Sequence, residues 1–158
     1  MSLKMTVTVK EDKASKRRLE RIRRTLIKAA RSHVDIGYFD GRPHPKTGES
    51  EATVAAINEF GVESLNIPER PFMAQTARNT EVGLALAKEW SRNIKSQRSP
   101  FSWNKIGKFY ANEVKSTIEG FSEPPNAPLT ISLKGFDNPL VETGHMMNNV
   151  QTRVKRDS

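Results

Sequence analysis

The side chains that could do acid–base or metal chemistry are few and scattered along the chain. The histidines have no second ligand at the i+3 or i+4 spacing of helical zinc sites; they are His33, His44 and His145. The carboxylates of Asp35, Asp40, Glu49 and Glu51 surround a short proline-rich segment, but they lack the spacing of a calcium-binding loop. The absence of cysteine excludes disulfides, thiolate zinc ligands and a cysteine nucleophile. We therefore expect no metal site and no cofactor.

Motifs for phosphate binding and for covalent catalysis are also missing from the sequence. The chain contains no P-loop, no dinucleotide-binding glycine fingerprint and no nucleophile elbow. Any serine could be combined on paper with some histidine and some aspartate, so such combinations carry no information. We expect no enzymatic activity. A small hydrolase or nuclease with an unrecognised site stays open as the least favoured alternative.

The distribution of charge is the first positive signal of a partner. The 158 residues carry 26 Lys and Arg against 18 Asp and Glu, a net charge of +8. Residues 10–31 hold ten basic side chains against three acidic ones, and residues 88–115 hold seven against two. Residues 40–69 reverse this, with six acidic side chains against two basic ones. Such asymmetry favours nucleic acid or the acidic face of another subunit as a partner, the alternative being a solvated helix face.

The spacing of apolar residues predicts strands near both ends of the chain and helices between them. Alternating apolar and polar residues predict strands at 5–10, 33–40, 129–136 and 150–155, with a helical turn as the alternative for 129–136. Apolar residues at three- and four-residue spacing predict helices at 15–32, 50–61, 71–97 and 103–119, and a short helical turn after Thr143 and Gly144.

Several residues mark where the predicted helices begin and end. Ser50 and Ser102 are suited to N-caps, and Gly61 is suited to ending the helix that starts at Ser50. Pro71 fits the first helical position. A weak stretch at 79–83 predicts a kink or break in the helix that follows.

These elements predict a single α+β domain over residues 1–158, with a small antiparallel sheet packed against several helices. We expect residues 1–4 to be a disordered or cloning leader. The proline-rich loops 41–50 and 121–128 are expected to be mobile in the free subunit. No apolar run is long enough for a membrane span or a signal peptide, which favours an intracellular protein without a membrane partner.

Three short segments have a further significance when taken together. They are VAAINEFG at 54–61, IPERPFM at 67–73 and KGFDNPLVETGHMMNNV at 134–150. In this order and spacing they resemble the boxes of the neck, or head–tail joining (tail-completion), proteins of long-tailed bacteriophages. The residues that carry the resemblance are Asn58, Glu59, Phe60, Gly61, Ile67, Pro68, Arg70, Pro71, Phe72, Lys134, Gly135, Pro139, Leu140, Thr143 and Gly144. The family often has a leucine and a serine after the Thr-Gly pair, where this chain has His145, Met146 and Met147.

The resemblance implies a structural protein of virion assembly rather than an enzyme. Its subunits would form a homo-oligomeric ring, of six copies, at the head–tail junction, and other head, neck and tail proteins would be its partners. DNA would pass through the ring without specific binding. The protein would be located in the virion, and in the host cytoplasm during assembly.

Two expectations concern individual side chains. Arg17, Arg21 and Arg24 are candidates for contact with the acidic 40–69 segment of a neighbouring subunit, or with DNA. The alternative function is non-specific nucleic-acid binding by the basic 15–31 helix. Within the boxes, Phe60 and Phe72 are expected to anchor a corner in the core, and Glu59 and Arg70 are expected to form an ion pair beside them.

Overall fold

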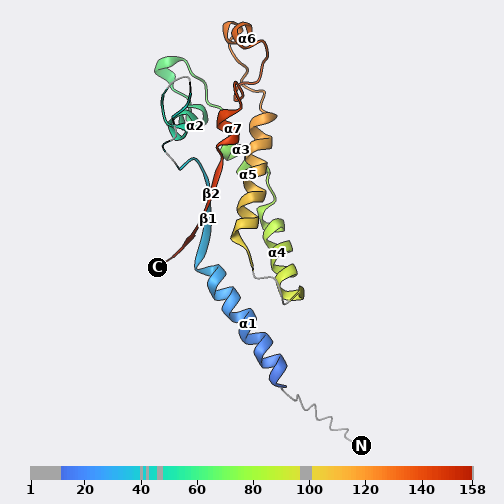
Figure 1. Ribbon diagram of the computed structural model, residues 1–158. Helices are drawn as coiled ribbons and strands as arrows, with labels where there is room; N and C mark the ends of the chain where they lie inside the picture. Colours follow the sequence, from blue (N-terminus) through green and yellow to red (C-terminus); the bar gives the residue numbers. More distant parts are fainter. Residues whose placement is uncertain (1–11, 40, 42, 46–47, 97–100, 158) are drawn as a thin grey trace, which may run out of the picture.

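A computed structural model describes residues 12–39, 41, 43–45, 48–96 and 101–157 (Figure 1). The elements, in chain order, are α1 Lys13–Ala30, β1 Ser32–Gly37, α2 Glu51–Phe60, the 3₁₀ turn η1 Glu63–Leu65, α3 Phe72–Asn79, α4 Val82–Ser96, α5 Trp103–Glu119, α6 Pro128–Lys134, α7 His145–Asn148 and β2 Gln151–Arg156. The α+β class is confirmed. The predicted strand at 5–10 and the leader at 1–4 lie outside the described residues.

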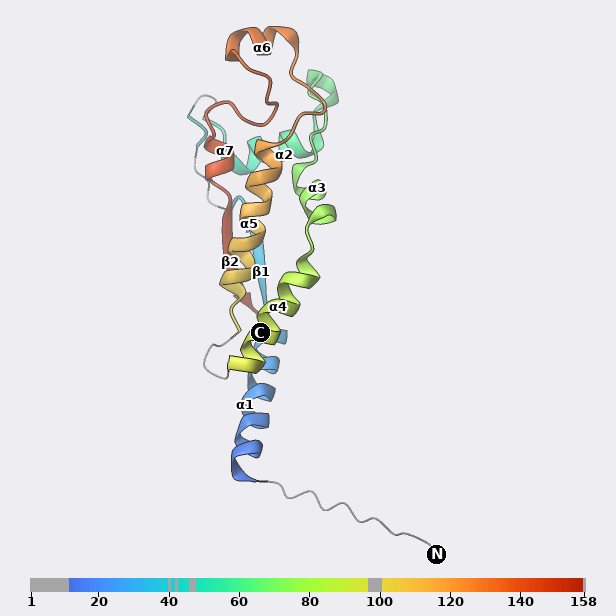
Figure 2. The same ribbon diagram turned by 90° about the vertical axis from the view of Figure 1, so that its right-hand side faces the viewer.

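The sheet is a two-stranded ribbon made from distant parts of the chain. β1 and β2 pair antiparallel, from Ser32 opposite Arg156 to Gly37 opposite Gln151. α5 lies along this ribbon (Figure 2). Gly107 allows the close approach, because a Cβ there would stand 2.8 Å from Cγ2 of Val34 on β1 and 3.2 Å from Cβ of Thr152 on β2.

The hydrophobic core lies where α5 meets α3, α7 and the ends of the ribbon. Phe72, Val114 and Ile118 are fully buried there. The core cluster consists of Ala55, Phe72, Ala111, Val114, Ile118, Phe121, Leu140, Met146 and Val150. Partly buried side chains, including Ile36 and Tyr38, cover its edge. The core therefore joins the middle of the chain to its C-terminal third.

The helix ends mostly follow the predicted signals. The side chains of Ser50 and Ser102 accept hydrogen bonds from the backbone N–H groups of Thr53 and Lys105. Gly61 ends α2 with φ 65°, where a Cβ would stand 2.7 Å from the Ile67 carbonyl oxygen. The helical region that starts near Pro71 breaks into α3 and α4 within the expected weak stretch.

Three local expectations are wrong. The strand preferred for 129–136 is absent, and the helical alternative holds: residues 128–134 form the helix α6, with Pro128 in its first turn and Gly135 ending it with φ 78°, and no described strand lies beside it. β1 ends at Gly37, three residues before the predicted end at 40. Pro71 precedes the first helical residue as the N-cap of α3. The short helical turn expected after Thr143 and Gly144 is confirmed as α7, with Gly144, at φ 72°, in its N-cap position.

The two proline-rich loops are both attached to the body of the same subunit. Of loop 41–50, residues 42, 46 and 47 lie outside the described set; Pro43 bridges Ser50, and the N–H of His44 donates to the Glu49 carbonyl at 2.6 Å. In loop 121–128, Phe121 and Asn126 are buried, and Asn126 bonds to Asp137 Oδ1 at 3.1 Å. The mobility of both loops in the free subunit stays a prediction, which amide hydrogen exchange measures.

Helix α1 stands away from the rest of the molecule as an arm, in both views (Figures 1 and 2). Its N-cap is Asp12, whose side chain accepts from Ser15 N–H. Only Ala29, in its last turn, is buried. The end of the arm is tied to the body by Trp103, whose Nε1–H donates to the Ala29 carbonyl at 3.3 Å.

Candidate functional site

The three sequence segments of the resemblance converge at the end of the molecule opposite α1. We call this region, formed by residues 51–73 and 121–150, the motif end. The Arg70 N–H donates to the Asn58 carbonyl at 2.7 Å, which joins the first segment to the second. The Glu59 carboxylate accepts from the backbone N–H groups of Met73, at 2.8 Å, and Ala74, at 3.0 Å. A residue of the first segment thus caps the helix that begins within the second.

The expected ion pair between Glu59 and Arg70 is wrong. Both side chains are buried, but each has its own backbone partners. The Arg70 guanidinium donates to the carbonyls of Pro124 and Pro125, at 3.4 Å each. Burial lowers the pKa of Arg70, and the negative charge of Asp137 opposes this shift. Arg70 therefore holds the proline loop, while Glu59 holds α3.

A buried acid–base contact links the third segment to the start of α2. Nδ1 of His145 hydrogen-bonds Oε1 of Glu51, whose side chain is fully buried. Asn149 Nδ2 also contacts His145 Nδ1, at 2.9 Å. The other carboxylate oxygen of Glu51 and the hydroxyl of Tyr38 are buried without a hydrogen-bond partner. Burial, and next the charge of Glu51, raise the pKa of Tyr38 well above its usual range.

Sequence reasoning missed this contact. From the sequence, Glu51 is only one of the carboxylates around the proline-rich segment, and His145 is only a histidine without a second ligand at helical spacing. The two are 94 residues apart, and neither segment contains a local signal for the other. His145 also lines a groove of about 270 Å³, to which Asn58, Lys134 and Thr143 contribute.

The other box residues have mostly structural positions. Phe72, Pro139 and Leu140 are buried, and Lys134 Nζ donates to the Asn138 carbonyl at 2.6 Å. Ile67 is half-buried and bridges Val62. Pro68, Gly135 and Thr143 are exposed, and Pro71 and Gly144 are half-buried. Phe60 corrects the expectation of a second core anchor: it is 73% exposed.

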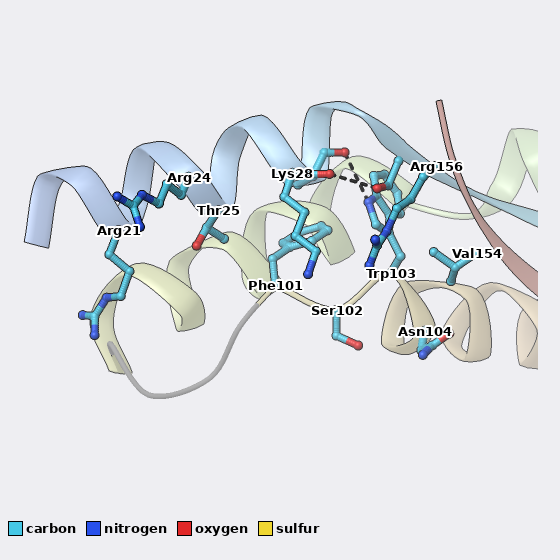
Figure 3. Close-up of a pocket in the computed structure, with 12 residues that line it drawn as sticks. Arg21, Arg24, Thr25, Lys28, Phe101, Ser102, Trp103, Asn104, Val154 and Arg156 are labelled. Carbon is cyan, nitrogen blue, oxygen red and sulfur yellow. Dashed lines mark hydrogen bonds between the residues drawn. The ribbon is translucent and has the colours of Figure 1, made fainter. Parts of the chain in front are cut away.

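At the other end of the molecule, basic side chains line a groove between α1 and the start of α5 (Figure 3). The groove measures about 370 Å³. Its cationic residues are Arg21, Arg24, Lys28 and Arg156; its apolar ones include Phe101, Trp103 and Val154. Two of the three predicted contact residues therefore belong to the groove. Arg17 does not line it, but it lies on the same helix face, four residues before Arg21.

Three of the apolar side chains of α1 are exposed on the described structure. Leu19 is 68% exposed, and Leu26 and Ile27 are each 45% exposed. Isolated exposed leucines are ordinary, but these lie on an arm with few contacts to its own body. The side chains remain in water unless another molecule covers them.

The geometry offers little for metal or membrane chemistry. Among the described residues, no three His, Asp or Glu side chains gather closely enough to hold a metal ion. No described helix combines the length and apolar character that crossing a bilayer requires.

No protein-family model, no curated protein and no solved structure matches this chain. The function must therefore be argued from the residues and from their arrangement.

Proposed function

We propose that the chain is a structural protein of phage virion assembly, a subunit of a homo-oligomeric ring of six copies at the head–tail junction through which DNA passes. The protein acts without a catalytic centre, in the virion and, during assembly, in the host cytoplasm. Its partners are further copies of itself and the head, neck and tail proteins above and below the ring.

The observation that carries the proposal is the arm α1. A helix that leaves Leu19, Leu26 and Ile27 in water gains most of its stability when a neighbour covers that face. Enzymes concentrate function in a pocket, whereas an assembly protein distributes it over surfaces at both ends of the subunit. The basic groove beside α1 and the exposed Phe60 at the motif end are two such surfaces.

The three segments of the resemblance support the same proposal in a second way. The first two segments hold each other through the Asn58 and Glu59 contacts, and the third is tied to the start of α2 through His145 and Glu51, so the boxes act as fold-defining corners. In a ring protein the fold itself presents the contact surfaces. Boxes that maintain a fold are what such a protein needs in place of catalytic residues.

A second candidate function is non-specific nucleic-acid binding, and the cations of the groove favour it. Arg21, Arg24, Lys28 and Arg156 converge on one hollow, as a phosphate backbone would require. If this is the function, the purified protein shifts random duplex DNA, with a log–log salt slope of about −0.9 per phosphate contact. The ring proposal expects weak or no binding by the isolated subunit.

The decisive experiment removes the gene from the phage or prophage that carries it and examines the lysate by electron microscopy. The ring proposal expects DNA-filled heads beside free, complete tails, and restored joining when the protein is supplied. Normal virions without the protein would overturn the proposal. Tight, salt-sensitive DNA binding together with normal virions would favour the second candidate.

A further inference from the structure

The basic groove beside α1 has an apolar floor that is held in place by its own contacts. Phe101 stacks on Trp90 with 4.2 Å between ring centroids and meets Trp103 edge-on at 5.3 Å. Trp103 is fixed in turn by its hydrogen bond to Ala29 (Figure 3). The groove therefore combines a preformed apolar floor with cationic sides, which suits an occupant that is both apolar and acidic.

The same contacts make the floor a poor platform for nucleic-acid bases. Single-stranded nucleic acid binds basic grooves by stacking its bases on open aromatic faces. Here Phe101 is engaged by two neighbouring rings, and the indole N–H of Trp103 is already donated. A protein side chain needs only the apolar hollow and not a free ring face.

A surface with the complementary chemistry lies at the motif end of the same chain. Phe60, at the end of α2, is 73% exposed, and Leu65, at the end of η1, is 66% exposed. The exposed carboxylates of Glu63 and Glu69 belong to the same corner. We call residues 60–69 the acidic corner.

The acidic corner is rigid, so docking it would cost little conformational entropy. Gly61 turns the chain at φ 65°. Val62 and Ile67 exchange two backbone hydrogen bonds, at 2.9 and 3.0 Å. Asn66, with φ 54°, closes the turn between them. The two apolar side chains are thus presented from a fixed loop.

The acidic corner cannot reach the groove of its own subunit, because the two lie at opposite ends of the molecule (Figures 1 and 2). We propose that the groove between α1 and α5 receives the acidic corner of a second copy, with Phe60 and Leu65 over the apolar floor and Glu63 facing the cations. This inference rests on the proposed function. The contact is heterologous, and such contacts close into rings when the rotation between copies allows it.

Site-directed crosslinking tests the contact even if it is weak, because the native chain has no cysteine. One protein carries Leu65→Cys in the corner, and another carries Thr25→Cys in the groove. The control pair combines Leu65→Cys with Leu129→Cys on α6, which is exposed but outside the groove. We expect the first mixture to form the disulfide-linked heterodimer at least about tenfold faster, the ratio that ~1.4 kcal/mol of docking free energy gives. Equal rates would overturn the proposal.

Charge exchange adds a readout that a chance collision would not give. Lys28→Glu in the groove, or Glu63→Lys in the corner, should each slow the crosslinking, and combining the two across the contact should restore it. Failure of the combined pair to recover overturns the assigned partners. Asn104→Cys, on the α5 side of the groove, replaces Thr25→Cys if that variant fails to fold.

Two further outcomes separate this contact from the alternatives. Suppose that duplex DNA binds the groove, that Lys28→Glu abolishes this binding, and that no crosslink to the acidic corner forms. This combination would overturn the proposal in favour of nucleic acid. If heads and tails join only when the protein is present but no crosslink forms, the contact is wrong and the proposed function stands. If the crosslink forms but virions assemble without the protein, the contact stands and the proposed function is wrong.

Discussion

Two buried charges at the motif end, Glu59 and Arg70, are held by backbone groups rather than by each other. Glu59 accepts two N–H groups at the start of α3, where the helix dipole also favours a negative charge. Arg70 satisfies two carbonyls of prolines, which cannot take part in a regular ladder. Each charge replaces a missing backbone partner in a corner that has little secondary structure.

Glu59→Ala should destabilise the protein by about 1.5–3 kcal/mol, because it leaves two buried N–H groups without their charged acceptor. Glu59→Gln, which retains one acceptor oxygen, should cost less. The measurement is urea unfolding, with Glu69→Ala, an exposed carboxylate, as the control expected within ~0.5 kcal/mol of the parent. In a double-mutant cycle, Glu59→Ala and Arg70→Ala should couple by less than ~0.5 kcal/mol. A larger coupling energy would show that Glu59 and Arg70 interact directly and would contradict the separate backbone partners.

Tyr38 should make stability sensitive to alkaline pH. Burial, reinforced by the charge of Glu51, raises its pKa in the folded protein. In the unfolded chain, a tyrosine ionises at about pH 10. Above that pH the unfolded chain loses its proton first, so stability falls by up to ~1.4 kcal/mol per pH unit until the folded pKa is reached. Tyr38→Phe removes this loss and also an unpartnered hydroxyl.

The test compares unfolding of the parent and Tyr38→Phe at neutral and at alkaline pH. We expect Tyr38→Phe to be at least as stable as the parent at neutral pH, because it removes an unpartnered buried hydroxyl, and its advantage to grow as the pH rises. Tyr110→Phe is the matched control: burial alone raises the pKa of Tyr110, and its hydroxyl is less deeply buried than that of Tyr38, so the advantage should be smaller. If the parent and Tyr38→Phe lose stability equally as the pH rises, the Tyr38 hydroxyl is not buried in its neutral form.

Among the elements, α5 has the central place because it contacts the ribbon, α3 and α7. Its approach to the ribbon depends on Gly107, and Gly107→Ala should cost about 1–3 kcal/mol through overpacking against Val34 and Thr152. Gly83→Ala, in α4, has open space around the added methyl group and should stabilise by up to ~1 kcal/mol through helix propensity. Thermal unfolding measures the two changes in stability, which should have opposite signs. Two stabilising substitutions would show that α5 lies further from the ribbon.

The elements also show how far sequence reasoning extends. Ser50, Ser102 and Gly61 marked helix ends correctly because capping is a local interaction within about one turn. Residues 129–136 were assigned wrongly because an alternating pattern predicts a strand only where another strand is available to pair with it. The exposed Leu129 and Leu133 of α6 show that its pattern was not set by core packing.

The candidate sites were predicted less completely than the elements, for the same reason. The sequence does not predict the groove, but it singles out two of the groove's cations, because Arg21 and Arg24 belong to a visible run of basic residues. Its remaining parts, Phe101, Trp103 and Arg156, come from segments that only the folded chain brings together. The exposure of Phe60 and the Glu51–His145 contact likewise depend on long-range packing that no local spacing encodes.

At the scale of the whole molecule, the surfaces without a partner lie at both ends. The arm and its basic groove form one end, and the acidic corner lies at the other (Figure 2). A ring around DNA needs directional contacts between subunits more than attraction to its cargo, since tight phosphate contacts would slow transit. Opposite charges at the two ends would guide docking and set the register more than they add affinity. Because exposed ion pairs contribute at most ~1 kcal/mol each, the proposed function predicts a free subunit that remains monomeric until a template ring is present.

Reversing Arg17, Arg21 and Arg24 to Glu should abolish head–tail joining without disturbing the fold. These side chains are exposed, and even the Arg24–Glu20 pair, at 3.1 Å, is a surface contact, so unfolding should change by no more than ~1 kcal/mol. Complementation of a gene-deleted phage with the triple variant should yield DNA-filled heads beside free tails. The matched control reverses three exposed basic residues on other helices, Arg78, Lys95 and Lys108, and should still join heads to tails. If the arm variant joins them with normal yield, α1 faces solvent or DNA in the assembled particle and does not contact a neighbouring subunit.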